Sequence, residues 1–353
     1  MGSAMPWVDW QAAVATACRV MPAGPAASQG ERLDCVADLR QAAAHAPELV
    51  AEAARLPNRG EQVRELVVDR RGIVAANVST AQELLRRLGL DARPPVSAPA
   101  RTAGALRGQA IGVVLGAVAP RLLGQFDAFG PSQRLLLVAP NIMAVERQIG
   151  AVPKDFRAWV ALHEQTHRVQ FASAPWLLDW FVQQLARAID DEPQTDLWTG
   201  LEARLTNWRR ARARGMTWSA QLNNAASSPA TVEVLDSIGA AMSLLEGHAD
   251  VMMDRAALPV VPTLASIRSG FDRRRARKGP SSWLGRLIGM DSKLAQYRDG
   301  AKFCRAVIAS GPGEDQGIEL LNRVFEAPTM LPSFDELINP ADWIARVGAT
   351  RAP

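Results

Sequence analysis

The pentad His163-Glu164-Gln165-Thr166-His167 (HEQTH) decides how this 353-residue chain is interpreted. On a helix, side chains four residues apart share a face, so the two imidazoles can bind one metal ion. Glu164 lies about 100° further round the helix than His163 and can reach a water molecule on that ion. The chain has 4 histidines, two of them in this pentad. Shuffling the sequence would produce the pattern on the order of 0.002 times per chain, so the spacing predicts a zinc site of the hydrolase type.

Residues just before the pentad predict that it lies inside a helix. Pro153 and Asp155 are typical of a helix start, and Phe156 and Trp159 follow at helical spacing. Further upstream, the compact apolar run Arg134 to Ala139 (RLLLVA) predicts a buried strand. Such a strand could form a sheet edge that pairs with a peptide above the metal helix, or it could be internal.

Most of the remaining sequence is rich in Ala, Leu and Arg at helical spacing, which predicts a mainly α fold with a minor β component. The short segment Leu66 to Val74 is an exception, because its β-branched residues around Arg71-Gly72 predict a strand or hairpin. The candidate helices cover residues 8–21, 31–54, 79–88, 176–189, 197–214, 228–254 and 291–308.

A segment rich in proline and small residues, ARPPVSAPARTA at residues 92–103, is typical of a linker. It suggests a mainly helical N-terminal region at 1–92, a linker-like segment at 93–104 and a metal-binding region at 105–353. The length is compatible with one compact unit that includes both regions.

Composition excludes several other classes of protein. The net charge of +4 is modest, and the basic stretch Arg268 to Lys278 lacks interleaved aromatic residues, so a solvated loop is favoured over a nucleic-acid site. Cys18, Cys35 and Cys304 form no CxxC pair, which indicates neither a disulfide framework nor a cysteine zinc site. We expect a reducing, cytoplasmic environment.

Neither a signal peptide nor a membrane span is expected. The first ten residues lack a basic region followed by an apolar one. The longest apolar run, Ala110 to Ala119, has about half the length that a bilayer requires. The sequence therefore predicts a soluble protein with no membrane partner.

A catalytic zinc ion normally has three protein ligands, so a third must lie elsewhere. The continuation found in metzincins requires Gly and His where this chain has Gln170 and Ser173. Glu246 and His248 are the candidates, and they lie about 200° apart on a helix, so both cannot bind the same ion in an unbroken helix. We favour Glu246, with His248 as the alternative.

Asp250 supports the choice of Glu246, because the two side chains stand one helical turn apart on the same face. Asp250 could then accept a hydrogen bond from the outer nitrogen of a ligand histidine. This ExxxD spacing is weak evidence alone, since it arises by chance roughly once in four such segments of a hundred residues. An acidic residue beside an apolar helix face is nevertheless costly unless it is paired or metal-bound.

Several further stretches carry a family resemblance over nearly the full length. Besides the pentad helix FRAWVALHEQTHRVQF at 156–171, they are VDW at 8–10, VVDRRG at 67–72, LLGQFD at 122–127, RLLLVAPNI at 134–142, APWL at 174–177, LLEGHAD at 244–250, QYRDG at 296–300, LPSFDEL at 331–337 and DWIARV at 342–347. Together they resemble the actinobacterial zincin-like metallopeptidase type 2 family, a group labelled as associated with deazaflavin-coenzyme biosynthesis. The resemblance implies a mostly helical zincin-like fold with a small sheet, and a zinc site from the HExxH helix plus a downstream acidic residue.

These features predict a zinc metallopeptidase that acts on a peptide or protein substrate. Zn²⁺ on His163, His167 and Glu246 would activate a water molecule, with Glu164 as general base. Tyr297 is the candidate donor to the oxyanion and His248 the second candidate, although an ordinary partly buried phenol is favoured over that role for Tyr297. The competing hypothesis is a non-catalytic, zinc-stabilised scaffold or partner-binding protein.

Overall fold

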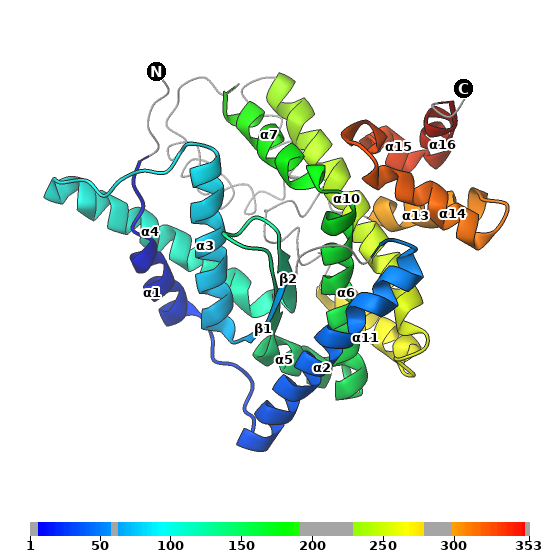
Figure 1. Ribbon diagram of the computed structural model, residues 1–353. Coiled ribbons are helices and arrows are strands. Elements are labelled where there is room, and N and C mark those ends of the chain that lie inside the picture. The colour runs from blue at the N-terminus through cyan, green and yellow to red at the C-terminus, as the bar shows by residue number, and fades with distance from the viewer. Residues whose placement is uncertain (1–5, 58–62, 191–228, 279–297, 350–353) are drawn as a thin grey trace.

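The computed structural model describes residues 6–57, 63–190, 229–278 and 298–349. This part of the chain is mainly helical with one small sheet, as the sequence predicts (Figure 1). Its α-helices are α1 (Trp10–Val20), α2 (Gln29–Ala54), α3 (Arg70–Arg87), α4 (Ala98–Val118), α5 (Ala139–Ile149), α6 (Pro153–Ser173), α7 (Trp176–Asp190), α10 (Pro229–Ala257), α11 (Leu264–Lys278), α13 (Arg298–Ser310), α14 (Glu314–Asn322), α15 (Phe334–Ile338) and α16 (Pro340–Ala349). The short 3₁₀ helices are η1 (Ala119–Arg121), η3 (Arg323–Phe325) and η4 (Pro328–Met330). The helix expected at 197–214 lies outside the described residues.

The sheet has the strand order β1-β3-β2, with β1 at Arg64–Val68, β2 at Gly124–Asp127 and β3 at Arg134–Val138. The central strand β3 pairs in parallel with β1 and antiparallel with β2. The buried strand expected at RLLLVA is thus confirmed, and of its two possible positions it takes the internal one. Among the described strands, β2 forms the sheet edge that lies against α6.

The segment Leu66 to Val74 does not form a hairpin. Strand β1 ends at Val68, and Asp69 then begins helix α3 by accepting a hydrogen bond from the backbone N–H of Gly72. Arg71 and Gly72 therefore lie in the first helical turn, because the side chain of Asp69 satisfies one of the free N–H groups at the helix start.

Helix α6 occupies the centre of the molecule, between the sheet, α2 and α10 (Figure 1). Its N-terminal half buries Phe156 and Trp159, which pack with Phe271 of α11 in an aromatic cluster. Pro153 occupies its first turn and Asp155 adds a negative charge there, as expected for a helix start. The pentad therefore lies inside a helix that is enclosed on several sides.

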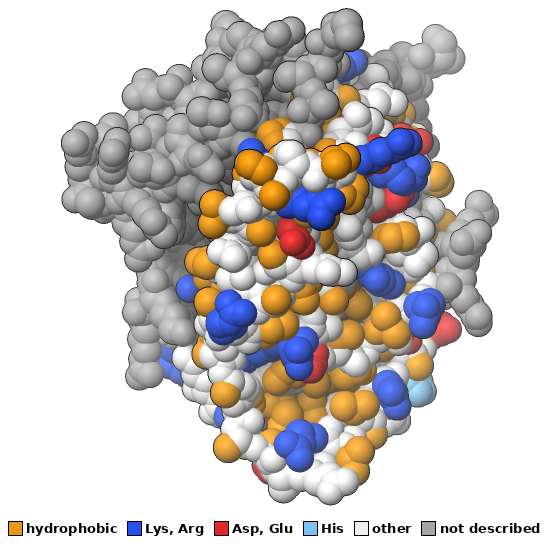
Figure 2. Space-filling model, turned by 90° about the vertical axis from the view of Figure 1, so that its left-hand side faces the viewer, with side chains coloured by type: hydrophobic (Ala, Val, Ile, Leu, Met, Phe, Trp, Pro, Cys, Tyr) orange, Lys and Arg blue, Asp and Glu red, His pale blue; other side chains and the backbone are white. Residues whose placement is uncertain are grey.

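Helices α1 and α4 pack together through glycine. Gly104, Gly108, Gly112 and Gly116 recur every fourth residue, and a Cβ at Gly108 would lie 2.1 Å from the carbonyl oxygen of Asp9. The opposite face of α4 exposes apolar side chains, with Leu106 60% and Val113 46% exposed. Figure 2 shows the side of the molecule that carries the N-terminal helices, where hydrophobic and basic side chains alternate and acidic ones are few.

One described helical segment, Ala98–Arg121, is long and apolar enough to cross a bilayer by length and composition. A helix packed inside a soluble fold meets the same criterion, and this one packs its glycine face on α1. Residues 98–104 of the expected linker form the start of α4. The division into regions 1–92, 93–104 and 105–353 stays a prediction.

Candidate metal centre

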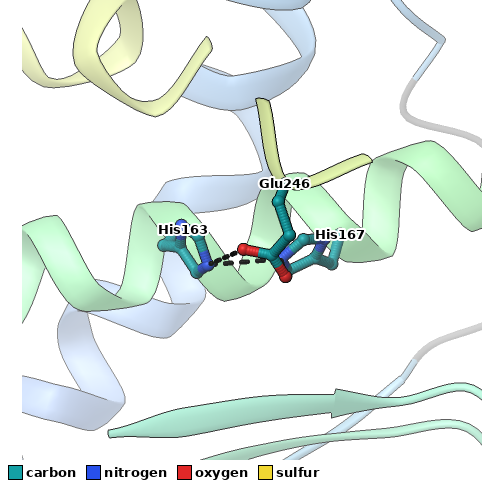
Figure 3. A group of neighbouring side chains, drawn as sticks. All are labelled: His163, His167 and Glu246. Atoms are coloured by element: carbon teal, nitrogen blue, oxygen red, sulfur yellow. Dashed lines mark hydrogen bonds and ion pairs between the residues drawn. The ribbon is translucent and has the colours of Figure 1, made fainter. Parts of the chain in front are cut away.

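The crossing of α6 and α10 brings three candidate ligands together. His163 and His167 project from α6, and Glu246 reaches down from α10 so that its carboxylate lies between them (Figure 3). The Nε2 atoms of the two histidines are 3.2 Å apart. The Glu246 oxygens lie 3.5 Å from Nε2 of His167 and 3.8 Å from Nε2 of His163. Within the described residues, this is the group of three side chains placed to hold a metal ion.

These separations fit a tetrahedral zinc site. Two nitrogens bound at 2.0–2.1 Å with a tetrahedral angle would be about 3.3 Å apart. The outer nitrogens also face acceptors, because Nδ1 of His167 lies 3.0 Å from Oε1 of Gln170 and Nδ1 of His163 lies 3.3 Å from the sulfur of Met253. Protons on both Nδ1 atoms leave two lone pairs facing each other at 3.2 Å. A cation between them relieves that repulsion, so the donor set fits a metal ion.

Electrostatics favour the same interpretation. Burial, followed by the charges of His167 and Arg268, holds the pKa of His163 well below its usual value, so its imidazole is neutral as metal ligation requires. Burial also raises the pKa of Glu246, which His167 partly opposes. A divalent cation would reverse this rise, because it stabilises the carboxylate directly.

Glu164 lies on the sheet side of α6. Its Oε2 accepts a hydrogen bond of 3.1 Å from the backbone N–H of Phe126 in β2. Burial and then the charge of Glu246 raise the pKa of Glu164 well above the usual carboxyl value. A buried carboxyl with a raised pKa, beside a metal site, is suited to receive and return a proton.

Gly124 gives Glu164 the room it occupies. A Cβ at position 124 would lie 2.6 Å from Cγ of Glu164 and 2.8 Å from its carboxyl carbon. Any larger residue would push the carboxyl away from the strand, so β2 sets the position of this side chain both by a hydrogen bond and by the absence of a side chain.

His248 is turned away from the three-residue group. Its ring is buried, its Nδ1 lies 3.0 Å from Nε2 of Gln170, and its edge packs on Phe325. Burial, followed by the charge of His167, lowers the pKa of His248 to about 3, while the side chain of Asn322 opposes the shift. Of the two candidates for the third ligand, the structure therefore places Glu246 at the site.

Asp250 is engaged by two arginines. Nη1 of Arg268 lies 2.7 Å from one carboxylate oxygen and Nη2 of Arg305 lies 3.3 Å from the other. This differs from the expected hydrogen bond to a ligand histidine, because guanidinium groups from α11 and α13 reach the carboxylate. Asp250 is coupled to the site through Arg268, whose charge lowers the pKa of His163. The other predicted residue, Tyr297, lies outside the described residues.

Sequence reasoning missed two residues that contact the candidate ligands or Glu164, namely Gln170 and Gly124, and a third, Arg268, whose charge lowers the pKa of His163. Gln170 follows His167 by three residues and so shares its helix face, which is a signal that the spacing alone contains. No sequence spacing predicts the roles of Gly124 and Arg268, because each belongs to a different element from the pentad helix.

Comparison with known proteins gives two matches. A family model described as zincin-like metallopeptidase matches residues 8–344. A solved structure from Chloroflexus aurantiacus, described as "a putative hydrolase with a novel fold", is similar with a TM-score of 0.68 and 30% sequence identity, over 98% of this chain and 100% of that chain. No curated protein matches the chain. These findings support a hydrolase, while the actinobacterial grouping and the deazaflavin association stay predictions.

Proposed function

Because this chain belongs to the zincin-like metallopeptidase family, we propose that it is a cytoplasmic peptidase that uses a zinc ion held by His163, His167 and Glu246. The observation that carries the proposal is the meeting of these three side chains, whose ligand atoms all lie within 4.8 Å of one another. Zinc in such a site polarises a carbonyl group and lowers the pKa of a water molecule.

Glu164 is the proposed general base. Its raised pKa makes it able to hold the proton taken from water and then pass it to the leaving amine. The Phe126 N–H fixes Oε2, so proton transfer falls to Oε1 of the same carboxyl group. Enclosure by β2 and α10 keeps this carboxyl out of bulk water, which favours the protonated state between the two transfers.

Strand β2 is the proposed docking edge for the peptide. It replaces β3 in this role, because β3 is paired on both sides. The N–H of Phe126 points away from β3 but is already bonded to Glu164, so a peptide would pair with the other backbone groups on this side of the strand. A peptide that adds to this edge by backbone pairing would pass beside the general base and the metal ligands.

The donor to the oxyanion is the least constrained part of the mechanism. Tyr297 keeps that role as a prediction. His248 does not take it, because its ring is fully buried and its Nδ1 is turned to Gln170.

The test is cleavage of a peptide library by the zinc-loaded protein, read by mass spectrometry. We expect defined cleavage sites with the wild type, and loss of cleavage with Glu164→Gln while zinc binding is retained. Glu233→Gln is the matched control, since Glu233 is an exposed glutamate on α10 and should leave activity unchanged. A wild-type protein that binds zinc at this site and cleaves nothing in the library would support the non-catalytic scaffold instead.

A further inference from the structure

Gln170 makes three polar contacts, one to His167 within α6 and two that join α6 to α10. It lies one turn beyond His167 and is fully buried. Its Oε1 is 3.0 Å from Nδ1 of His167, while its Nε2 is 2.8 Å from the carbonyl oxygen of Leu245 and 3.0 Å from Nδ1 of His248. The side chain thus stands between a candidate zinc ligand and the one histidine near the site that is not a ligand.

The chemistry of these partners fixes the direction of every hydrogen bond. A backbone carbonyl can only accept, so the amide nitrogen of Gln170 must face Leu245. The second N–H of the same nitrogen then donates to Nδ1 of His248. The amide oxygen is left for His167, whose Nδ1 must therefore carry a proton. A flipped amide would place two oxygens against each other at Leu245.

This network sets the tautomer of His167. With its proton on Nδ1, the lone pair of His167 is on Nε2, the atom that faces Nε2 of His163 and the carboxylate of Glu246. A histidine free to exchange tautomers would present that lone pair only part of the time, and its ring would also be free to rotate.

His248 in turn holds the amide. Its ring is buried against Phe325, with ring centroids 5.1 Å apart, so it cannot turn away from Gln170 without opening the core. Asn322 of α14 influences the pKa of this ring, and its Nδ2 donates a hydrogen bond of 2.8 Å to the carbonyl oxygen of Ala54 in α2. The support of His167 therefore extends through α10 to α14 and α2.

We propose that Gln170 is a positioning residue for the metal centre: its amide, held by Leu245 and His248, locks His167 in the Nδ1–H tautomer and aims its Nε2 at the metal. The side chain that orients the ligand is thus a neutral amide, and Asp250, which the sequence favours for that role, is paired with Arg268 and Arg305 instead. The inference rests on the proposed zinc site and does not require peptidase activity.

Gln165 offers a matched control on the same helix. It is also fully buried, and its Nε2 donates to the carbonyl oxygen of Ala43 at 3.1 Å. Its Oε1 accepts from Arg168 at 2.7 Å. Gln165 therefore makes a comparable set of hydrogen bonds, directed to α2 and β1 and not to the candidate ligands.

The first experiment measures the zinc dissociation constant of each variant by competition with a chelator. Gln170→Leu should weaken zinc binding by about 10- to 100-fold, the usual loss when the partner of a ligand histidine is removed. Gln170→Glu keeps an oxygen acceptor for His167 but loses both N–H donors and sets an oxygen against the Leu245 carbonyl, so it should weaken zinc binding as well. Gln165→Leu should stay within about 3-fold of the wild type. His248→Phe keeps the ring contact but removes the acceptor for Gln170, and should fall between these limits.

The second experiment records the histidine tautomers of the metal-free protein by long-range ¹H–¹⁵N correlation spectra. The wild type and Gln165→Leu should show His167 protonated on Nδ1, whereas Gln170→Leu should show a mixture of tautomers. If Gln170→Leu does not fold, His248→Phe takes its place in both measurements. Equal zinc affinity and an unchanged His167 tautomer in the variant and in Gln165→Leu would overturn the proposal. Failure of the peptide library to be cleaved would not, since neither readout involves a peptide.

Discussion

Two helix crossings hold this molecule together by opposite means. Where α6 meets α10, the buried side chains include Gln170 and His248, both polar. Where α1 meets α4, the contact is made by four glycines that let the backbones approach closely. The first crossing depends on which polar groups its side chains carry. The second depends on the small size of its glycine residues.

This difference separates residues that serve the metal site from residues that allow the helices to pack closely. A buried polar group costs free energy unless its hydrogen bonds are satisfied, so a crossing built from them is a poor way to gain stability alone. The glycine contact depends on close approach of the two backbones, and Thr16 of α1, against Gly112, is a buried polar side chain there. Substitutions at the first crossing should therefore alter metal binding or rate, and those at the second should alter folding.

Loss of the third ligand should have the largest effect. Structural zinc sites with four ligands bind with about 10–16 kcal/mol, so removal of one ligand by Glu246→Ala should cost roughly 3–4 kcal/mol, or about 10²–10³-fold in zinc affinity. Titration with a fluorescent zinc indicator measures this. Glu233→Ala, on the exposed face of the same helix, should bind zinc as the wild type does. Unchanged affinity in Glu246→Ala would place the third ligand elsewhere.

Gly108→Ala tests the second crossing. Its Cβ would lie 2.1 Å from the carbonyl oxygen of Asp9, which cannot move independently of α1, so the helices must separate. We expect a loss of about 3 kcal/mol in the free energy of unfolding, the upper end for overpacking, and unchanged zinc affinity of the folded protein. Urea denaturation gives the first quantity.

Gly348→Ala provides the comparison, because a Cβ at that position meets nothing within 4 Å. Its free energy of unfolding should equal or slightly exceed that of the wild type. Equal stability of the two alanine variants would show that the α1–α4 contact can relax.

Gly124→Ala should affect rate more than stability, because the added Cβ displaces Glu164 from its contact with β2. A misplacement of about 1 Å in a catalytic group can cost up to about 100-fold in rate, whereas the edge strand can shift for about 1 kcal/mol of stability. Steady-state kinetics on a cleaved library peptide, together with urea denaturation, would separate the two. A stability loss without a rate loss would exclude a positioning role for Gly124.

The outer face of α4 should tolerate change with the smallest effect. Val113 is 46% exposed and points away from the glycine contact, so Val113→Gln should change the free energy of unfolding by less than about 0.5 kcal/mol. Thermal denaturation measures it. A loss above about 1.5 kcal/mol would mean that this face is covered in the folded protein.

The sequence predicts those parts of the site that depend on spacing within one helix. The pairing of His163 with His167 follows from the four-residue repeat, and the angle between Glu246 and His248 indicates that only one of them can face the histidines. The mainly helical fold and the buried strand β3 follow from composition and periodicity in the same way.

Contacts between elements that are far apart in the chain cannot be predicted from the sequence alone. Gly124 contacts Glu164 from a strand 40 residues earlier in the chain, and neither local sequence predicts this contact. The pairing of Asp250 with Arg268 does not follow from local sequence for the same reason, because Arg268 comes from α11 and its orientation depends on Trp159 and Asp254. The strand next to the metal helix was likewise decided by sheet order and not by apolar content.

The most direct test of the zinc site is a crystal structure of the zinc-loaded protein with anomalous data on both sides of the zinc absorption edge. The account predicts one anomalous peak at 2.0–2.2 Å from Nε2 of His163, Nε2 of His167 and a carboxylate oxygen of Glu246. A peak coordinated by His248 with Glu246 turned away, or a zinc ion bound away from the pentad, would contradict it.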